Sequence, residues 1–282
     1  MKDHSEPFPI PPKILSEMED CNNAIKLNPK DAEAYSNRGI LYCVLGDNDQ
    51  GIKDFDKAIE LNPKFIGGYI NRGSTCARLG NFQQAIKDFN NVIDLIPKDT
   101  VGYFNRGLAY GILGHYNQAI EDYDKVIELN PNEIKAYNNR GIAYHNLGKY
   151  DEAIEDYNKA IELNPQLAGA YRNRGTAYMH HLDYYERAIK DFDKAIEIDA
   201  EDAETYTNRG LAFSKLGSFN EALKDYNKAI LLDPKLSPAY YNRAVAYHKS
   251  GRINQALDDY KTAAKLGFEQ AQNYLKSQGI DW

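Results

Sequence analysis

The tripeptide Asn-Arg-Gly recurs along this chain at a nearly constant spacing. Its asparagines, together with the one that opens the variant Asn-Arg-Ala near the end, are Asn37, Asn71, Asn105, Asn139, Asn173, Asn208 and Asn242. Successive asparagines are 34, 34, 34, 34, 35 and 34 residues apart. A fixed period of this length indicates equivalent structural units that stack on one another, because a single small unit cannot bury its own apolar face.

The pattern within each unit predicts two helices separated by a turn. In the fourth unit Tyr137, Gly141 and Tyr144 lie at i, i+4 and i+7, which places them on one stripe of a helix. A second stripe with the same spacing begins at Ala153. Gly148 lies between the two stripes and favours a turn there.

This pattern resembles the tetratricopeptide repeat (TPR) family, whose unit is a helix–turn–helix of 34 residues. With the first Tyr of each unit numbered as position 4, family positions 8, 11, 20, 24, 27 and 32 of the fourth unit are Gly141, Tyr144, Ala153, Tyr157, Ala160 and Pro165. The resemblance covers roughly residues 16–278. It implies an all-α fold, a right-handed α-solenoid of stacked helix–turn–helix repeats.

The repeat register divides the chain into four parts. We expect an extended Pro-rich arm over residues 1–15, a partial repeat with only its second helix over 16–31, seven full units over 32–268, and a C-terminal capping helix and tail over 269–282. The seven units are 32–65, 66–99, 100–133, 134–167, 168–202, 203–236 and 237–268. The fifth unit has one extra residue where the others have Leu-Gly, so its turn should differ.

Composition excludes several classes of protein. The chain has 282 residues and a net charge of −7, which argues against a broad nucleic-acid-binding surface. No apolar run approaches the roughly 18 residues of a membrane helix, and the acidic start is unlike a secretory signal. Three cysteines without a CxxC pair are typical of a reducing compartment. These features predict a cytoplasmic protein with no nucleic-acid partner and no membrane insertion.

Motifs for catalysis or cofactor binding are missing from the sequence. There is no GxGxxG, P-loop, HExxH or GxSxG segment, so we expect neither an enzyme nor a cofactor. His145, His180 and His248 fall at similar positions of different units, without clustered carboxylates beside them. Zinc requires three or four ligands that converge on one point, so a metal site is not expected.

Every full unit pairs an Arg at position 7 with an Asp at position 23. In the TPR family a buried Leu generally stands at position 7. The arginines are Arg38, Arg72, Arg106, Arg140, Arg174, Arg209 and Arg243. The aspartates are Asp54, Asp88, Asp122, Asp156, Asp191, Asp225 and Asp259. A partly buried Arg needs a carboxylate partner, so we predict a ladder of structural ion pairs, with a row of anion sites as the alternative. On this reading Asp156→Ala destabilises the chain, whereas Arg140→Leu keeps the fold.

The seven repeated asparagines precede these arginines by one residue. That offset turns them by about 100° around the helix, toward the concave surface of the stacked first helices. An amide offers two donors and an acceptor, so a row of amides can bind a peptide backbone whatever its side chains. The row resembles the asparagine ladder of superhelical peptide-binding arrays in this family, such as the array joined to the O-linked N-acetylglucosamine transferase. The alternative is that the amides bond only to adjacent helices and hold the superhelix.

Other positions that face the concave side in this family change character along the chain. The first three units present apolar side chains there, including Ile70, Phe104 and Leu108. The last four units present basic side chains, including Lys135, Arg172, Lys215 and Lys249. This gradient predicts a partner segment that is apolar and then acidic. The alternative is a solvated face with some packing between repeats.

These features together predict a non-enzymatic scaffold for protein–protein interaction. An extended or helical segment of a partner protein would bind in the concave groove through the asparagine ladder. The alternative is a self-assembling structural scaffold, a homo-oligomer that uses the N-terminal arm or the exposed solenoid ends.

Overall fold

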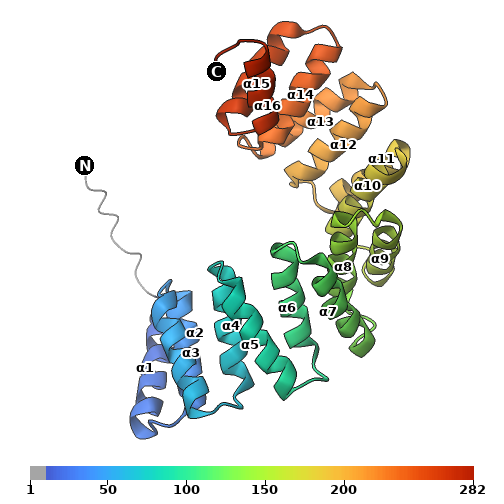
Figure 1. Ribbon diagram of the computed structural model, residues 1–282. Helices are drawn as coiled ribbons and strands as arrows, with labels where there is room; N and C mark the ends of the chain where they lie inside the picture. Colours follow the sequence, from blue (N-terminus) through green and yellow to red (C-terminus); the bar gives the residue numbers. More distant parts are fainter. Residues whose placement is uncertain (1–10) are drawn as a thin grey trace, which may run out of the picture. The chain divides into compact units, whose positions relative to one another are not determined.

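The chain folds into a succession of α-helices, as Figure 1 shows for a computed structural model that describes residues 11–282. The helices are α1 (Pro12–Leu27), α2 (Ala32–Val44), α3 (Asn48–Leu61), α4 (Ile66–Arg78), α5 (Phe82–Leu95), α6 (Thr100–Ile112), α7 (Tyr116–Leu129), α8 (Ile134–Asn146), α9 (Tyr150–Leu163), α10 (Ala168–Leu182), α11 (Tyr185–Ile198), α12 (Ala203–Lys215), α13 (Phe219–Leu232), α14 (Ser237–Lys249), α15 (Ile253–Lys265) and α16 (Glu269–Ser277). The all-α fold of stacked helix pairs predicted from the sequence is confirmed.

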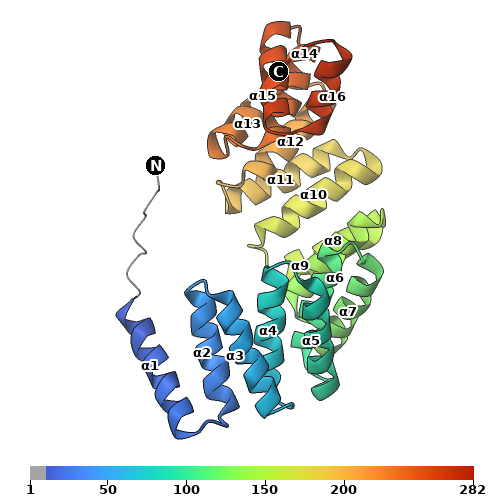
Figure 2. The same cartoon turned by 60° about the vertical axis from the view of Figure 1, so that its left-hand side comes forward.

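The helices belong to two compact units. Unit 1 comprises residues 1–136 and unit 2 comprises residues 137–282, so α8 crosses the boundary. Within each unit a helix packs against the next helix in the chain, and helices follow one another side by side (Figure 2). In unit 1 the first helices α2, α4 and α6 also contact their successors, and so do α10, α12 and α14 in unit 2. We call the surface formed by these helices the first-helix face of each unit.

The turn between the two helices of a repeat depends on glycine. Gly46 and Gly217, for example, have φ angles of 87° and 79°, a left-handed conformation in which a side chain would be strained. In the first of these turns the backbone N–H of Asp47 donates to the carbonyl of Tyr42. This bond satisfies a carbonyl that the helix end leaves free and lets the chain reverse direction.

The interior of a repeat is formed where a glycine of the first helix meets an aromatic ring of the second. A Cβ atom added at Gly210 would lie 2.7 Å from Cε1 of Tyr226, whose side chain is fully buried. Alanines such as Ala222 and Ala229 complete the same interface and are fully buried. Small residues therefore let the helix backbones approach closely, and the ring fills the remaining space.

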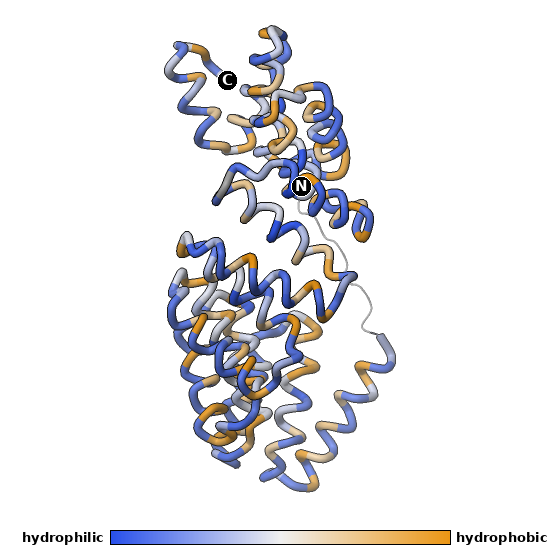
Figure 3. The backbone as a smooth tube through the Cα atoms, turned by 90° about the vertical axis from the view of Figure 1, so that its right-hand side faces the viewer, coloured by the Kyte–Doolittle hydropathy of each residue, from blue (hydrophilic) through white to orange (hydrophobic). Residues whose placement is uncertain are grey.

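Hydrophobic and hydrophilic residues alternate along the helices instead of forming long apolar runs (Figure 3). This distribution fits thin layers of helices that are each exposed on one side. Among residues 11–282, no helix combines the length and apolar character needed to cross a membrane.

The N-terminal boundary differs from the sequence prediction. We expected an extended arm to residue 15, but α1 begins at Pro12. Proline is tolerated at the first position of a helix because the N–H that it lacks would have no intrahelical partner there. Residues 1–10 of the predicted arm lie outside the described residues, so self-assembly through the arm stays a prediction.

The fifth repeat differs at its turn. Helix α10 has 15 residues, whereas α8 and α12 have 13. Asp183 ends it with a φ of 53°, and it is the one non-glycine residue among residues 11–282 with a positive φ. The extra residue thus lengthens the helix, which carries His180 and His181 in its last turn.

Candidate functional site: the first-helix faces

Each repeated Arg lies against the Asp of its own repeat. In all seven pairs Nε and Nη2 of the guanidinium donate to the two carboxylate oxygens at 2.5–2.9 Å. The Asp side chains are at most 9% exposed, and the Arg side chains are 17–22% exposed. Such paired, parallel hydrogen bonds are a strong form of ion pair, and they join the two helices of one repeat.

The same guanidinium also reaches the preceding repeat. Nη1 donates to a residue on the preceding second helix in Arg38, Arg72, Arg106, Arg174, Arg209 and Arg243. In chain order these acceptors are Asn22, Asp56, Asn90, Asn158, Asp193 and Asn227. Each of these six arginines therefore joins three helices in two repeats.

Tyrosine rings flank the arginines. The guanidinium carbon of Arg38 lies 5.3 Å from the ring centroid of Tyr35 and 6.0 Å from that of Tyr42. The hydrogen bonds that Arg38 donates to Asp54 raise its pKa further, so this cation keeps its charge at any physiological pH. The arginines thus have several protein partners, and the row of free anion sites kept as an alternative has no support in this geometry.

The difference in burial between the Arg and the Asp of each pair changes which substitution we expect to be the more destabilising. Because the Asp side chains are the more deeply buried, loss of an Arg leaves the worse-solvated charge without its partner. An Arg209 without Asp225 would still contact Asp193. We therefore expect removal of the Arg to be the more damaging change, which reverses the order predicted from the sequence.

The ladder asparagines lie on the first helices, and several use their amide nitrogen within the protein. Nδ2 of Asn71 donates to the Ser36 hydroxyl at 3.0 Å, and Nδ2 of Asn173 donates to Oδ1 of Asn138 at 3.1 Å. Asn208 and Thr176 form a similar but longer contact, 3.5 Å. These three bonds link consecutive first helices.

The other ladder amides are placed differently. Asn105 donates to the carbonyl of Val101 on its own helix, and Oδ1 of Asn139 accepts from Asn138. The amides of Asn37 and Asn242 have no hydrogen bond within residues 11–282. Some of the amide nitrogens of the ladder thus bond to adjacent helices, as the structural alternative predicts. Oxygens such as Oδ1 of Asn71 and Asn173 accept no hydrogen bond from described residues.

Unit 1 has an apolar pocket on its first-helix face. The pocket measures about 230 Å³ and lies between α2 and α4. Its lining residues are Ile40, Cys43, Val44, Phe55, Asn71, Ser74 and Thr75. Of the apolar residues predicted for this face, Ile70, Phe104 and Leu108 are half-buried, and the Phe104 ring packs on Tyr123 at a centroid distance of 6.0 Å.

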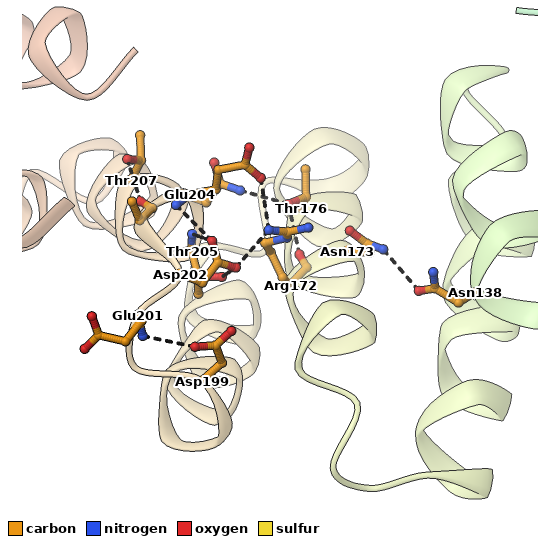
Figure 4. A network of polar contacts seen from close by, with 12 residues as sticks. Asn138, Arg172, Asn173, Thr176, Asp199, Glu201, Asp202, Glu204, Thr205 and Thr207 are labelled. Atoms are coloured by element: carbon orange, nitrogen blue, oxygen red, sulfur yellow. Dashed lines mark hydrogen bonds and ion pairs between the residues drawn. The ribbon is translucent and has the colours of Figure 1, made fainter. Parts of the chain in front are cut away.

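Unit 2 has a polar pocket of about 230 Å³ on its first-helix face. Its lining residues are Ile142, His145, Tyr157, Arg172, Asn173, Thr176, Glu204 and Asn208. Figure 4 shows Arg172 held between two acids, Asp202 at the end of its own repeat at 2.8 Å and Glu204 of the next repeat at 2.9 Å. The prediction that Arg172 offers its charge to an acidic partner segment is wrong, because this Arg already has two carboxylate partners within the chain.

Three other predicted cations remain accessible. Lys135 in unit 1 and both Lys215 and Lys249 in unit 2 are exposed and have no ion pair among the described residues. The basic character expected for the later repeats therefore depends on these lysines rather than on Arg172.

Two histidines meet although they belong to different repeats. The ring centroids of His145 and His180 lie 5.2 Å apart, and the Tyr150 ring packs on both. Nδ1 of His145 is buried without a hydrogen-bond partner, and burial together with the nearby His180 lowers the pKa of His145 below its usual value. In the part of the chain that the structure describes, no group of three His, Cys, Asp or Glu residues is placed to hold a metal ion.

These features define a helical-repeat protein whose side chains join each repeat to the next. The chain belongs to the tetratricopeptide repeat family. One tetratricopeptide repeat model matches residues 32–65, 101–133, 134–167, 203–236 and 237–266. Two further models of TPR repeats match residues 184–217 and 66–99. Each matching model describes a repeat, and none describes a catalytic domain.

Solved structures share the fold. A tetratricopeptide repeat protein from Parabacteroides merdae is 22% identical with a TM-score of 0.72, over 87% of this chain and 97% of that one. MamA is 28% identical with a TM-score of 0.51, over 59% of this chain and 96% of that one. YrrB, a TPR protein with an unusual peptide-binding site, is 24% identical with a TM-score of 0.53, over 68% of this chain and 100% of that one. No curated protein sequence matches this chain.

Proposed function

We propose that the protein is a non-enzymatic scaffold that binds an extended or helical segment of a partner protein on its first-helix faces. The observation that carries this proposal is the position of the ladder asparagines. Asn71 lines the pocket of unit 1, and Asn173 and Asn208 line the pocket of unit 2. A row of amides beside pockets can bind main chain and side chains of one segment at the same time.

The hydrogen bonds decide what the amides can offer to that segment. Because Nδ2 of Asn71 and of Asn173 already donates to a neighbouring helix, each amide presents its oxygen. A carbonyl oxygen accepts from the backbone N–H groups of an extended chain, which recur regularly whatever the side chains. The bonds between repeats also fix the orientation of the amides before a ligand binds, which reduces the entropy lost on binding.

The pockets suggest the side chains of the segment. The unit 1 pocket suits an apolar anchor, because Ile40, Cys43 and Val44 line it. The exposed Lys215 and Lys249 of unit 2 suit acidic side chains. A segment with an apolar part followed by acids fits both units, and the likeness in fold to YrrB, which has a peptide-binding site, supports binding of this kind.

Selection from a displayed peptide library tests the proposal. The parent protein would be compared with the variant Asn71→Ala/Asn173→Ala. The control variant Asn117→Ala/Asn220→Ala changes two exposed asparagines at the start of second helices, one in each unit. Peptides enriched on the parent should bind the control equally and the ladder variant about tenfold more weakly, the effect of about 1.4 kcal/mol in lost hydrogen bonds. Equal binding to all three proteins would show that the ladder is not a binding site.

A further inference from the structure

Helix α1 is the second helix of a repeat whose first helix is not among the described residues. Its residues match those of α3 at a spacing of 34: Asp20 corresponds to Asp54, and Asn22 corresponds to Asp56. The contacts follow the same register. Asn22 accepts from Nη1 of Arg38 at 2.9 Å, as Asp56 accepts from Nη1 of Arg72.

In the intact repeats a first helix covers this face of the second helix. Helix α2 covers α3, where Arg38 pairs with Asp54 and Gly39 packs against the buried Phe55. On α1 the equivalent carboxylate, Asp20, is exposed and has no hydrogen bond or ion pair among residues 11–282. No residue of α1 is buried. The ladder acid of this helix is therefore present without its cation.

The neighbouring helix α2 has an unused group on the same side. Asn71 donates to Ser36 on the preceding first helix, but Asn37 has no preceding first helix within the described residues and its amide makes no hydrogen bond there. Ile40, on the same helix, is 40% exposed. Asp20 on α1 and Asn37 on α2 thus face the same space without partners among the described residues. The equivalent residues of the next repeat, Asp54 and Asn71, are hydrogen-bonded.

Two adjoining pockets occupy this space, which we call the α1–α2 groove. They measure about 370 and 270 Å³. Their lining residues are Glu17, Asp20, Cys21, Ala24, Asp31, Glu33, Ala34, Asn37, Ile40 and Leu41. Four of these are acids, and none is Lys, Arg or His. The groove therefore combines an apolar floor with a negative rim.

Two residues of α1 make this groove different from the equivalent surface of a full repeat. Cys21 stands where the second helices of the full repeats carry a buried ring such as Phe55, so the volume of that ring is left open. Glu17 stands where the full repeats have Gly51 or an alanine, and it adds a carboxylate to the rim. An occupant would have to bring a large apolar side chain of its own and at least one cation.

We propose that the α1–α2 groove docks a helix of a partner protein that has a basic face and one large apolar side chain. The apolar side chain fills the space beside Cys21, and an Arg of the docked helix pairs with both oxygens of Asp20, as Arg38 pairs with Asp54. Charge complementarity with four carboxylates selects a basic helix over an acidic or neutral one. This surface adjoins the first-helix face of unit 1, with which it shares Asn37 and Ile40, but Cys21 and the acids of α1 lie outside that face.

Segments of the chain itself fit the groove less well. The sequence of residues 1–10 has Asp3 and Glu6 against Lys2 and so is not basic. Helix α16, at the other end of the array, contains no Arg, and its one exposed cation, Lys276, is matched by the exposed acid Glu269. Residues of α16 therefore do not supply the cationic face that the groove requires.

A helical peptide with the sequence of residues 134–148, held helical by a lactam staple, is a suitable probe because it is a first helix with Lys135 and Arg140 in its sequence. Its binding to the full chain is measured by fluorescence anisotropy. We expect Asp20→Arg to weaken binding at least tenfold. The matched control Glu19→Arg, on the same helix but outside both pockets, should leave binding within about twofold. The peptide change Arg140→Gln should weaken binding to the parent but not further to Asp20→Arg.

Alkylation of cysteines by N-ethylmaleimide, followed by mass spectrometry, locates the bound peptide. Peptide in the α1–α2 groove should slow modification of Cys21 and leave that of Cys43, which lines the unit 1 pocket, unchanged. Slowed modification of Cys43 alone would place the peptide on the first-helix face and overturn the proposal. Absence of binding at millimolar peptide would also overturn it. A concentration-dependent dimer that Asp20→Arg abolishes would show that a second copy is the occupant, and would overturn the assignment to a partner helix.

Discussion

The arginine at the seventh position of each repeat is the residue on which the contacts between helices depend most. Its guanidinium donates from two nitrogens within its own repeat, and in Arg72, for example, a third nitrogen donates to Asp56 of the repeat before. Burial raises the pKa of Asp122, while hydrogen bonds from Arg106 act in the opposite direction. Desolvation is the larger of the two effects, so we expect the pair to contribute more to the specificity of packing than to net stability.

A set of three variants tests this balance in unit 2. Arg209→Leu leaves the buried Asp225 unpaired and should lower the free energy of unfolding by about 3–5 kcal/mol. Asp225→Leu should cost less, because Arg209 is more exposed and still contacts Asp193. The double variant Arg209→Leu/Asp225→Leu should lie close to the parent. Urea unfolding measures all three, and a double variant as unstable as Arg209→Leu would refute the pairing argument.

The pH dependence of Arg209→Leu gives an independent check. An unpaired buried carboxylate has a pKa above its value in the unfolded chain, and burial already raises the pKa of Asp225 in the parent. The folded variant then binds a proton before the unfolded chain does as pH falls. Its deficit in stability should therefore shrink between pH 7 and about pH 4. Exposed pairs are the control: Lys194→Ala, which breaks the pair with Glu197, should change stability by less than about 0.5 kcal/mol at any pH.

His145 gives a second dependence on pH, of opposite sign. Its pKa in the folded chain is below the usual 6.5, because of burial and the nearby His180. Above pH 6.5 the side chain is neutral in both states, but below it the unfolded chain binds the proton more readily, so stability should fall. Arg172 and Glu204 line the same pocket from α10 and α12, and Tyr150 packs on the ring from α9. When the pH is lowered from 7.5 to 5.5, the melting temperature of His145→Gln should fall less than that of the parent. The control His115→Gln changes an exposed histidine, and its melting temperature should fall as much as that of the parent.

At the scale of the element, the approach of two helices depends on glycine against an aromatic ring. The last full repeat shows how this contact can vary, because Ala244 replaces the glycine and is fully buried near Tyr260. The Tyr260 ring there packs on Tyr274 of α16, at a centroid distance of 4.2 Å. The methyl group of Ala244 is thus accommodated in the one repeat whose second-helix ring packs on the ring of Tyr274.

Two glycine-to-alanine changes of opposite expected effect test this packing. In Gly210→Ala the new methyl group would lie 2.7–3.1 Å from three ring carbons of the buried Tyr226, so stability should fall by about 1–3 kcal/mol. In Gly169→Ala, within α10, nothing lies within 4 Å of the added atom, and stability should rise by about 0.5–1 kcal/mol. Calorimetric melting temperatures that move the same way for both variants would contradict the contact model.

At the scale of the whole molecule, the two ends of the array differ. Helix α16 buries Ala271 and Leu275 completely, while α1 has no buried residue. In a repeat protein each element is stabilised by its neighbours, so an element covered on one side opens most easily.

Hydrogen exchange followed by mass spectrometry measures this difference. Amides of α1 should exchange faster than those of α3, which buries Asp54, Phe55 and Ala58, while those of α16 should show intermediate protection. Protection of α1 as strong as that of α3 would mean that the end of the array is covered. A docked basic helix should raise the protection of α1 selectively.

The sequence by itself determined the helix pairs, their register and the Asp partner of every repeated Arg. These features depend on residues at fixed offsets within one repeat, and a 34-residue period shows such offsets directly. The start of α1 was placed four residues late, because a Pro-rich segment gave no sign of which proline begins the helix.

Tertiary structure alone decided what depends on contacts between repeats. It turned the amide nitrogens of Asn71 and Asn173 toward the preceding first helix, paired Arg172 with Glu204 of the next repeat, and brought His145 against His180. The physical reason is distance. Whether a polar group in a groove is free depends on side chains of the adjacent repeat, 32–35 residues away in sequence and 2.9–3.1 Å away in space. The period shows which repeats are adjacent, but it does not show which side chains of two adjacent repeats come within hydrogen-bonding distance.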